Sequence, residues 1–283
     1  MKKIGLVDYY LDEFHGNHFP GWVANSRYAK DFEIACAYGE IDKQGGLTTD
    51  EWCAKMGIKK SDSLEALVNE CDCIAVLAPD EAHSHERLSE LAIKSKKPVF
   101  IDKVLADDIE SGRRICETAA KCGSPMYSSS ALRFFKELEN IPEDKRSGQD
   151  IDVLALVGAA SFEVYIVHQI EMMVTLCGPR VQRIMNVGTK AAPVLVADLG
   201  DATVTMTVMG KIPFAASIGY SDGSACYLPE CTEFFPRSID AMLEFFVSGK
   251  APATFEDSLC VVAAHTAAHA ARHTPFSWIK VEV

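Results

Sequence analysis

The chain has 283 residues, of which 48% are hydrophobic and 24% are charged, and its formal net charge at pH 7 is −12. This length exceeds that of a typical single domain, so we expect two domains with substantial cores. The negative charge argues against a nucleic-acid partner, because binding to a phosphate backbone depends on clustered Lys and Arg. The apolar run near the N-terminus stops at Asp8, too early for a signal core or a membrane span. We therefore expect a cytoplasmic protein with no membrane partner.

Cysteine and histidine spacing does not predict a metal site. Most of the ten cysteines lie in apolar strand-like or helix-like segments, so we expect buried free thiols rather than disulfides. Cys71 and Cys73 are too close together for a zinc knuckle, and no second pair has ligand spacing. His265, His269 and His273 share one face of a predicted helix, where two histidines can hold a metal. No acid or cysteine has matching spacing, so we interpret them as an exposed or interfacial stripe.

Short β-type segments alternate with helix-type segments through the first half of the chain. The predicted strands cover residues 3–7, 33–38, 73–78, 98–102 and 125–128, and the predicted helices cover residues 21–30, 63–70, 82–94 and 108–121. This alternation predicts parallel βαβ units with right-handed crossovers. We therefore expect an α/β protein in which residues 1–130 form a doubly wound parallel sheet.

The pattern changes after residues 140–150, a polar segment with Pro and Gly that reads as a surface loop. Predicted strands then follow one another with short turns, which favours an antiparallel sheet. These strands cover residues 153–157, 181–187, 193–197, 202–209, 212–218 and 277–281, and the predicted helices cover residues 163–176, 238–248 and 255–272. Residues 131–283 are therefore expected to form an α+β domain with a mainly antiparallel open sheet.

Three segments follow one another in order: residues 78–83, residues 100–106 (Phe-Ile-Asp-Lys-Val-Leu-Ala) and residues 168–178 (His-Gln-Ile-Glu-Met-Met-Val-Thr-Leu-Cys-Gly). They resemble motifs of the glucose-fructose oxidoreductase/inositol dehydrogenase (Gfo/Idh/MocA) family. Residues 78–83, Ala-Pro-Asp-Glu-Ala-His, resemble its Thr-Pro-Asn/Asp-x-x-His turn. Residues 100–106 resemble its Glu-Lys-Pro-Leu-Ala motif, and residues 168–178 resemble its His-x-x-Asp-x-x-x-x-Leu-x-Gly helix. The resemblance implies an N-terminal Rossmann-like domain for NAD or NADP and a C-terminal substrate domain. It also implies redox chemistry on a hydroxyl or carbonyl of a sugar, cyclitol or similar small molecule, and a homodimer or homotetramer assembled through the C-terminal sheet.

The resemblance points to Lys103, His168 and Glu171 as catalytic residues. Lys103 follows Asp102 at a strand end, where its cation could hold a substrate hydroxyl. His168 is suited to acid/base chemistry, and Glu171 lies three residues later on the same helix face, where it could orient the imidazole or bind a substrate hydroxyl. The alternatives are a surface lysine and a half-buried histidine capped by a local carboxylate. In this sequence Val104 replaces the usual proline after the lysine.

The segment after the last strand of the first domain is a candidate substrate contact. It contains Ser129 and Arg133, and the family often places an Asn or Arg here against nicotinamide or substrate. A guanidinium suits a carboxylate or hydroxyls. Arg133 could equally tie the two domains together, and both interpretations stay open.

The loop after Val7 lacks the glycines with which a dinucleotide loop approaches pyrophosphate. Asp8 and Tyr10 occupy the first two glycine positions, and Glu40 is the nearest acid to the end of the second strand. The further candidate cofactor contacts are Val7, Ala78, Pro79, His83 and Asp102. Two hypotheses follow: an NAD(P)-dependent oxidoreductase with a divergent phosphate loop, or a cofactor-poor relative that serves as a ligand-binding or structural partner subunit.

Overall fold

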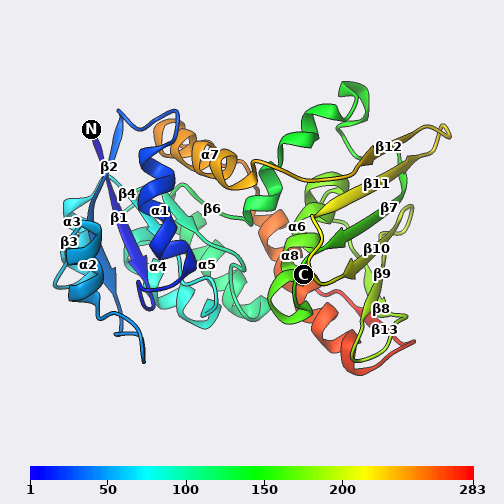
Figure 1. Cartoon of the computed structure of the whole chain (residues 1–283), viewed down its shortest axis with the longest axis horizontal. Helices are drawn as coiled ribbons and strands as arrows, with labels where there is room; N and C mark the ends of the chain where they lie inside the picture. Colours follow the sequence, from blue (N-terminus) through cyan, green and yellow to red (C-terminus); the bar gives the residue numbers. More distant parts are fainter. The chain divides into compact units, whose positions relative to one another are not determined.

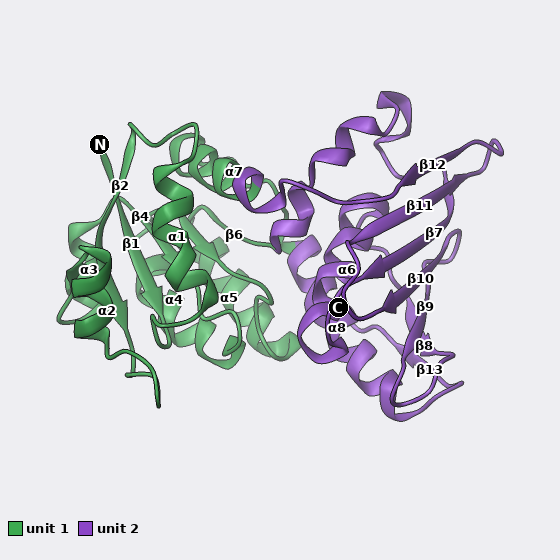
Figure 2. Cartoon of the chain, viewed as in Figure 1, with its two compact units in different colours: residues 1–129, 238–255 green, residues 130–237, 256–283 purple.

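The computed structural model describes all 283 residues, which form two compact units (Figure 2). The first unit contains residues 1–129 and 238–255, and the second contains residues 130–237 and 256–283. Residues 238–255 thus belong to the first unit, although the sequence pattern places them in the second domain. Two neighbouring phenylalanines explain the difference, because Phe245 packs edge-on against Tyr127 and Phe246 packs against Phe32.

The first unit contains a six-stranded parallel sheet with strand order β3-β2-β1-β4-β5-β6. Its strands are β1 (Lys2–Asp8), β2 (Phe32–Gly39), β3 (Lys59–Lys60), β4 (Cys73–Val76), β5 (Val99–Ile101) and β6 (Met126–Ser128). This order is that of dinucleotide-binding folds, and it confirms the predicted doubly wound sheet. The strand order reverses between β1 and β4.

Helices lie on both faces of this sheet (Figure 1). They are α1 (Phe14–Ala24), α2 (Thr49–Met56), α3 (Leu64–Glu70), α4 (His85–Lys94), α5 (Ile109–Cys122) and α7 (Phe234–Ser248). Helix α3 packs so closely on β1 that a Cβ at Gly5 would collide with the Leu67 side chain. The sequence pattern was wrong about α1, which begins at Phe14 rather than at Gly21 because the Glu13 carboxylate caps it.

The second unit contains a seven-stranded sheet with strand order β12-β11-β7-β10-β9-β8-β13. Its strands are β7 (Ile151–Gly158), β8 (Arg183–Asn186), β9 (Val194–Asp198), β10 (Thr203–Val208), β11 (Ala215–Tyr220), β12 (Ala225–Leu228) and β13 (Trp278–Lys280). Only β7 and β10 pair in parallel, so the sheet is mainly antiparallel, as predicted.

One face of this sheet is covered by helices α6 (Phe162–Cys177) and α8 (Phe255–His273), and the other carries no helix (Figure 1). The burial pattern of β7 reflects this, since Leu154 and Leu156 are buried whereas Val153 and Ala155 are exposed. All ten cysteines are free thiols. None of the helices combines the length and apolar character needed to cross a membrane.

Candidate active site

The carboxyl ends of β1, β4 and β5 lie at one edge of the parallel sheet in the first unit. Ligands of open α/β sheets bind at this edge, near the point where the strand order reverses. Asp8 ends β1. The other strand-end candidates follow β4 and β5, namely Ala78, Pro79, Asp102 and Lys103. The structure therefore gathers these predicted residues at the edge where a ligand site is expected.

Asp8 is a buried acid at the reversal point, with 1% of its surface exposed. Its Oδ1 accepts a hydrogen bond from the Ala78 backbone N–H at 3.1 Å, whereas its buried Oδ2 has no hydrogen-bond partner. Burial, followed by the negative charge of Glu13, raises the pKa of Asp8 well above its ordinary value. Asp8 therefore holds a proton at pH values where an exposed aspartate is ionised.

Glu13 caps the N-terminus of α1 with its side chain. The carboxylate accepts hydrogen bonds from the backbone N–H groups of His15, at 2.7 Å, and of Gly16. The residue is only 6% exposed. Burial raises the pKa of Glu13, although the hydrogen bond from Gly16 and the nearby His15 counteract the shift. A glutamate thus occupies the helix end that faces phosphate in dinucleotide-binding folds.

His15 joins the α1 terminus to the end of β5 by an ion pair with Asp102. Its Nδ1 contacts Asp102 Oδ2, and Asp102 Oδ1 accepts a hydrogen bond from the Lys103 N–H at 2.8 Å. Burial alone would lower the pKa of His15, but the charge of Asp102 and the hydrogen bond raise it. Burial alone would raise the pKa of Asp102, but His15 lowers it. Both shifts favour the charged pair.

The Lys103 side chain is held at the sheet edge by the turn after β4. Its Nζ donates a hydrogen bond to the Pro79 carbonyl at 3.0 Å and lies 3.9 Å from Asp80 Oδ1. Only 8% of the side chain is exposed. The structure therefore does not support the interpretation of Lys103 as an ordinary surface lysine. A nearly buried ammonium at this edge is suited to hydrogen bonding with a substrate oxygen.

His85, which the sequence analysis did not select, links the segments after β4 and β5. Its Nε2 lies 2.7 Å from the Leu77 carbonyl, and its Nδ1 lies 3.0 Å from the Val104 carbonyl. The ring is fully buried, and burial lowers its pKa. No local sequence pattern marks His85 for this role, because its contacts depend on tertiary packing. His85 positions the Lys103 segment rather than facing a ligand.

Glu40 follows β2, where an acid commonly binds ribose hydroxyls. The Arg87 guanidinium holds both of its carboxylate oxygens, at 2.8 and 2.5 Å. Arg87 also lies over the Tyr9 ring, 5.6 Å from its centroid. Tyr9 in turn contacts the His83 ring edge-on. The predicted Glu40 and His83 therefore lie in one polar cluster on this side of the unit.

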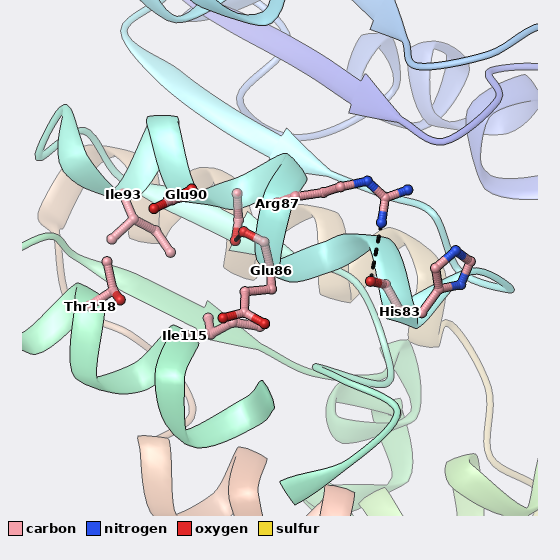
Figure 3. Close-up of a pocket in the computed structure, with 8 residues that line it drawn as sticks. His83, Glu86, Arg87, Glu90, Ile93, Ile115 and Thr118 are labelled. Carbon is pink, nitrogen blue, oxygen red and sulfur yellow. Dashed lines mark hydrogen bonds between the residues drawn. The ribbon is translucent and has the colours of Figure 1, made fainter. Parts of the chain in front are cut away.

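A cavity of about 260 Å³ lies beside this cluster, between α4 and α5 (Figure 3). His83 and Arg87 lie at one end of it, and Ile93 and Thr118 lie at the other. Its lining contains neither Lys103 nor any other strand-end candidate. The cavity therefore shares His83 with the predicted cofactor contacts, but none of the strand-end residues.

Among the other predicted cofactor contacts, Val7 lies fully buried within β1, and its carbonyl accepts the Leu77 N–H at 2.8 Å. Tyr10 is partly exposed, with Lys43 Nζ 5.2 Å from its ring centroid. Ser129 is buried at the end of the first segment of this unit. Val7 therefore acts as a core strand residue.

In the second unit, Ser130 orients the side chain of His168 on α6. Ser130 Oγ lies 2.7 Å from His168 Nδ1. The imidazole also meets the rings of Tyr165 and Phe214 edge-on. Ser130 thus contacts the imidazole directly, while the Glu171 carboxylate accepts the Ser130 N–H. Ser130 and His168 are separated by 38 residues, which explains why local spacing did not reveal their contact.

Glu171 instead binds the segment that contains Arg133. Its carboxylate accepts hydrogen bonds from Arg133 Nε at 2.6 Å and from the Ser130 N–H at 3.2 Å. Arg133 also lies 3.6 Å from Asp257 on α8. Burial raises the pKa of Glu171 despite the charge of Arg133. Arg133 and Glu171, at 9% and 2% side-chain exposure, form a buried pair within one unit, and this pair positions Ser130.

Residues 14–130 match the model of an oxidoreductase family with an NAD-binding Rossmann fold. This segment is therefore similar to the Gfo/Idh/MocA family. The matched segment begins at the first residue of α1, so β1 and the loop after it precede it. The match confirms the family resemblance and the NAD-binding class of the first unit. No curated protein matches the sequence.

Solved structures show the same fold along the whole chain. Myo-inositol dehydrogenase from Lactobacillus casei, in complex with NAD(H) and myo-inositol, has a TM-score of 0.82 at 12% identity, covering 100% of this chain and 97% of that one. Scyllo-inositol dehydrogenase from the same species, with NAD(H) and scyllo-inositol, has a TM-score of 0.73 at 13% identity, with 99% of each chain covered. Myo-inositol 2-dehydrogenase from Lactobacillus plantarum has a TM-score of 0.77 at 11% identity, with 99% of each covered.

The residues at the start of α1 do not fit a pyrophosphate in this conformation. The N–H groups of His15 and Gly16, which would face phosphate oxygens, are bonded to the Glu13 carboxylate. Asp8 and Asp102 add further carboxyl groups close to Glu13. The fold thus matches the NAD-binding class, but the phosphate position is filled by the chain itself.

The His, Cys, Asp and Glu side chains do not form clusters with metal-ligand geometry. No group of three or more His, Cys, Asp or Glu side chains is arranged to hold a metal ion. His265 and His269 face each other on α8, with their Nε2 atoms 3.1 Å apart. Burial lowers the pKa of His269, which packs against Phe162.

Proposed function

We propose that this chain is an NAD-dependent oxidoreductase that acts on a hydroxyl/carbonyl pair of a sugar, cyclitol or similar small molecule. One observation carries the proposal: the family-matched unit holds a nearly buried lysine, Lys103, at the carboxyl edge of β5. Such an edge is where open α/β sheets bind their ligands.

Each unit contributes a group suited to this reaction. In the first, Lys103 Nζ would donate a hydrogen bond to the oxygen that changes between hydroxyl and carbonyl, and stabilise negative charge on it. In the second, the His168 imidazole would transfer the proton, with its ring orientation set by Ser130. Arg133 and Glu171 would support His168 indirectly through Ser130.

The proposed substrate class is that of the Lactobacillus casei proteins, whose structures hold myo-inositol or scyllo-inositol together with NAD(H). At 12% and 13% identity, these proteins support the fold, and the substrate class is our inference. A polyol suits the proposed chemistry, because each of its hydroxyls can accept a hydrogen bond from a cationic donor such as Lys103.

Glu40 favours NAD over NADP in this proposal. Its carboxylate follows β2, where it would accept hydrogen bonds from the ribose hydroxyls and repel a 2′-phosphate. The neighbouring Arg87 already donates hydrogen bonds to both oxygens of Glu40, so its guanidinium is engaged and less available to a 2′-phosphate. We therefore expect NAD to bind more tightly than NADP.

Titration of the protein with NADH and with NADPH, monitored by fluorescence and thermal shift, tests the proposal. We expect saturable binding of NADH at sub-millimolar concentration, and weaker binding of NADPH. If the folded protein binds neither dinucleotide, the oxidoreductase proposal fails, and a ligand-binding or structural partner role remains.

A further inference from the structure

The phosphate position of the first unit contains an anion that belongs to the chain. In dinucleotide-binding folds, the N-terminus of the helix after the first strand presents free N–H groups to the pyrophosphate. In this chain, the same N–H groups, from His15 and Gly16, donate to the Glu13 carboxylate. Glu13 thus makes the contacts with α1 that a phosphate group would make.

The loop is built around this carboxylate. Gly16 leaves no space for a side chain, because a Cβ there would collide with the Leu11 carbonyl and lie 3.1 Å from Glu13 Oε1. The Glu13 N–H donates to the same Leu11 carbonyl at 2.9 Å, and Leu11 is 2% exposed. Gly16, in the first turn of α1, therefore serves the close approach of Glu13 to the helix, rather than an approach of pyrophosphate.

Another acid, Asp108, also caps a helix in this unit, but its surroundings differ from those of Glu13. Asp108 caps α5 by accepting a hydrogen bond from the Ser111 N–H at 2.9 Å, but Asp108 is exposed to solvent. Glu13 is buried at the reversal point of the sheet, beside Asp8. Burial of a carboxylate is costly unless its hydrogen bonds compensate for it, so the bonds to α1 matter for its placement.

The charges around Glu13 do not favour an added diphosphate. Asp8 and Asp102 lie near enough to affect its ionisation. The cation nearest to it, His15, is paired with Asp102. A dinucleotide that enters in the usual orientation would therefore meet a filled anion position with acidic neighbours.

We propose that Glu13 is an internal competitor for the pyrophosphate subsite, and that a dinucleotide binds there only when the Glu13 side chain leaves the α1 terminus. The proposal rests on the proposed function, since it assumes that the first unit takes a dinucleotide. It makes Glu13 the residue that sets the affinity for the cofactor's phosphates.

Calorimetric titration with ADP, adenosine and NADH tests this proposal. ADP carries the diphosphate, and adenosine lacks it. We expect Glu13→Ala to raise the affinity for ADP and NADH by about 10-fold or more, since two backbone donors are freed and a negative charge is removed. The affinity for adenosine should change less than about twofold. Asp108→Ala, which removes the acidic cap of α5, is the matched control and should change none of the three affinities.

Glu13→Gln provides a second variant if Glu13→Ala does not fold, because it retains a capping oxygen without the charge. It should raise the affinity for ADP by at least about threefold. If the folded variants bind ADP no more tightly than the unmodified protein does, while NADH binds to all of them, the internal-competitor proposal is overturned and the proposed function stands. If no variant binds NADH or ADP, both are overturned.

Discussion

At the scale of single residues, the candidate site depends on carboxyl groups whose protonation is set by burial. Asp8 and Glu171 are both buried acids with raised pKa values, one in each unit. Asp102 differs, because His15 and the Lys103 N–H stabilise its ionised form. At neighbouring strand ends, the first unit therefore places one acid whose protonated form is favoured by burial and one whose ionised form is stabilised.

Asp8 predicts a fall in stability with rising pH. A raised pKa means that the folded chain holds a proton which the unfolded chain loses above the ordinary value of 3.8, so folding becomes less favourable as the pH rises through the window above 3.8. His15 adds a change of the same sign above 6.5, because its pKa is also raised. We expect Asp8→Asn to unfold at higher urea concentration than the unmodified protein at pH 8, by roughly 1–3 kcal/mol in free energy of unfolding, and to differ less at pH 5.

The exposed Asp31 provides the control for this measurement. Asp31→Asn should follow the unmodified protein across the pH range. If Asp8→Asn shows the same pH dependence as the unmodified protein, then Asp8 is ionised in the folded state and the account of its burial is wrong.

At the scale of elements, α7 is the segment whose packing corrects the domain boundary. The sequence could not reveal this, because Phe245 and Phe246 pack against strands that lie more than a hundred residues earlier. Lys2 Nζ also donates to the Phe246 carbonyl at 2.9 Å. The helix therefore completes the core of the first unit.

We expect Phe246→Ala to lower the free energy of unfolding by about 3–5 kcal/mol, because it leaves a cavity in a packed core. Val247→Ala, at the next position of the same helix, should change it by less than about 0.5 kcal/mol, because Val247 is 56% exposed. Urea unfolding of both variants measures the difference. Equal effects of the two substitutions would mean that α7 does not pack as described.

The alternation of strands and helices predicted both sheets except for the short strands β3 and β12, and it failed at several helix starts. α1 was missed at its beginning because Gly16 and Pro20 disfavour a helix locally and glutamate is not a common cap. α2 was missed entirely, although Thr48 and Glu51 form a capping box that the sequence contains. The start of α1 depends on tertiary contacts, whereas the capping box of α2 is a local pattern that the sequence already contains.

At the scale of the whole molecule, the strand-end residues were predictable and their partners were not. Motif position identified Lys103 and His168, because the ends of parallel strands and one helix face follow from the fold. His15 lies 87 residues from Asp102, and Ser130 lies 38 residues from His168. No local pattern encodes such pairs, so only the structure shows which group orients which.

The open face of the second sheet predicts self-association, and we propose a homodimer or homotetramer through it. Val153, on the inner strand β7, is 48% exposed on that face. Val153→Arg should reduce the molar mass measured by light scattering after size exclusion, because a charge would be buried in the contact. Leu91→Arg, at an exposed position of α4, is the control and should not change it. A monomeric unmodified protein, or an unchanged mass for Val153→Arg, would contradict the proposal.

The central claim is that Lys103 holds the reacting oxygen of a polyol in an NAD-dependent oxidation. The most direct measurement is the appearance of NADH absorbance in a polyol screen, with the unmodified protein, Lys103→Met and the exposed-lysine control Lys121→Met. We predict that Lys103→Met lowers turnover by about 100-fold or more while its affinity for NADH stays within about threefold. Lys121→Met should retain full turnover. Undiminished turnover in Lys103→Met would contradict the claim.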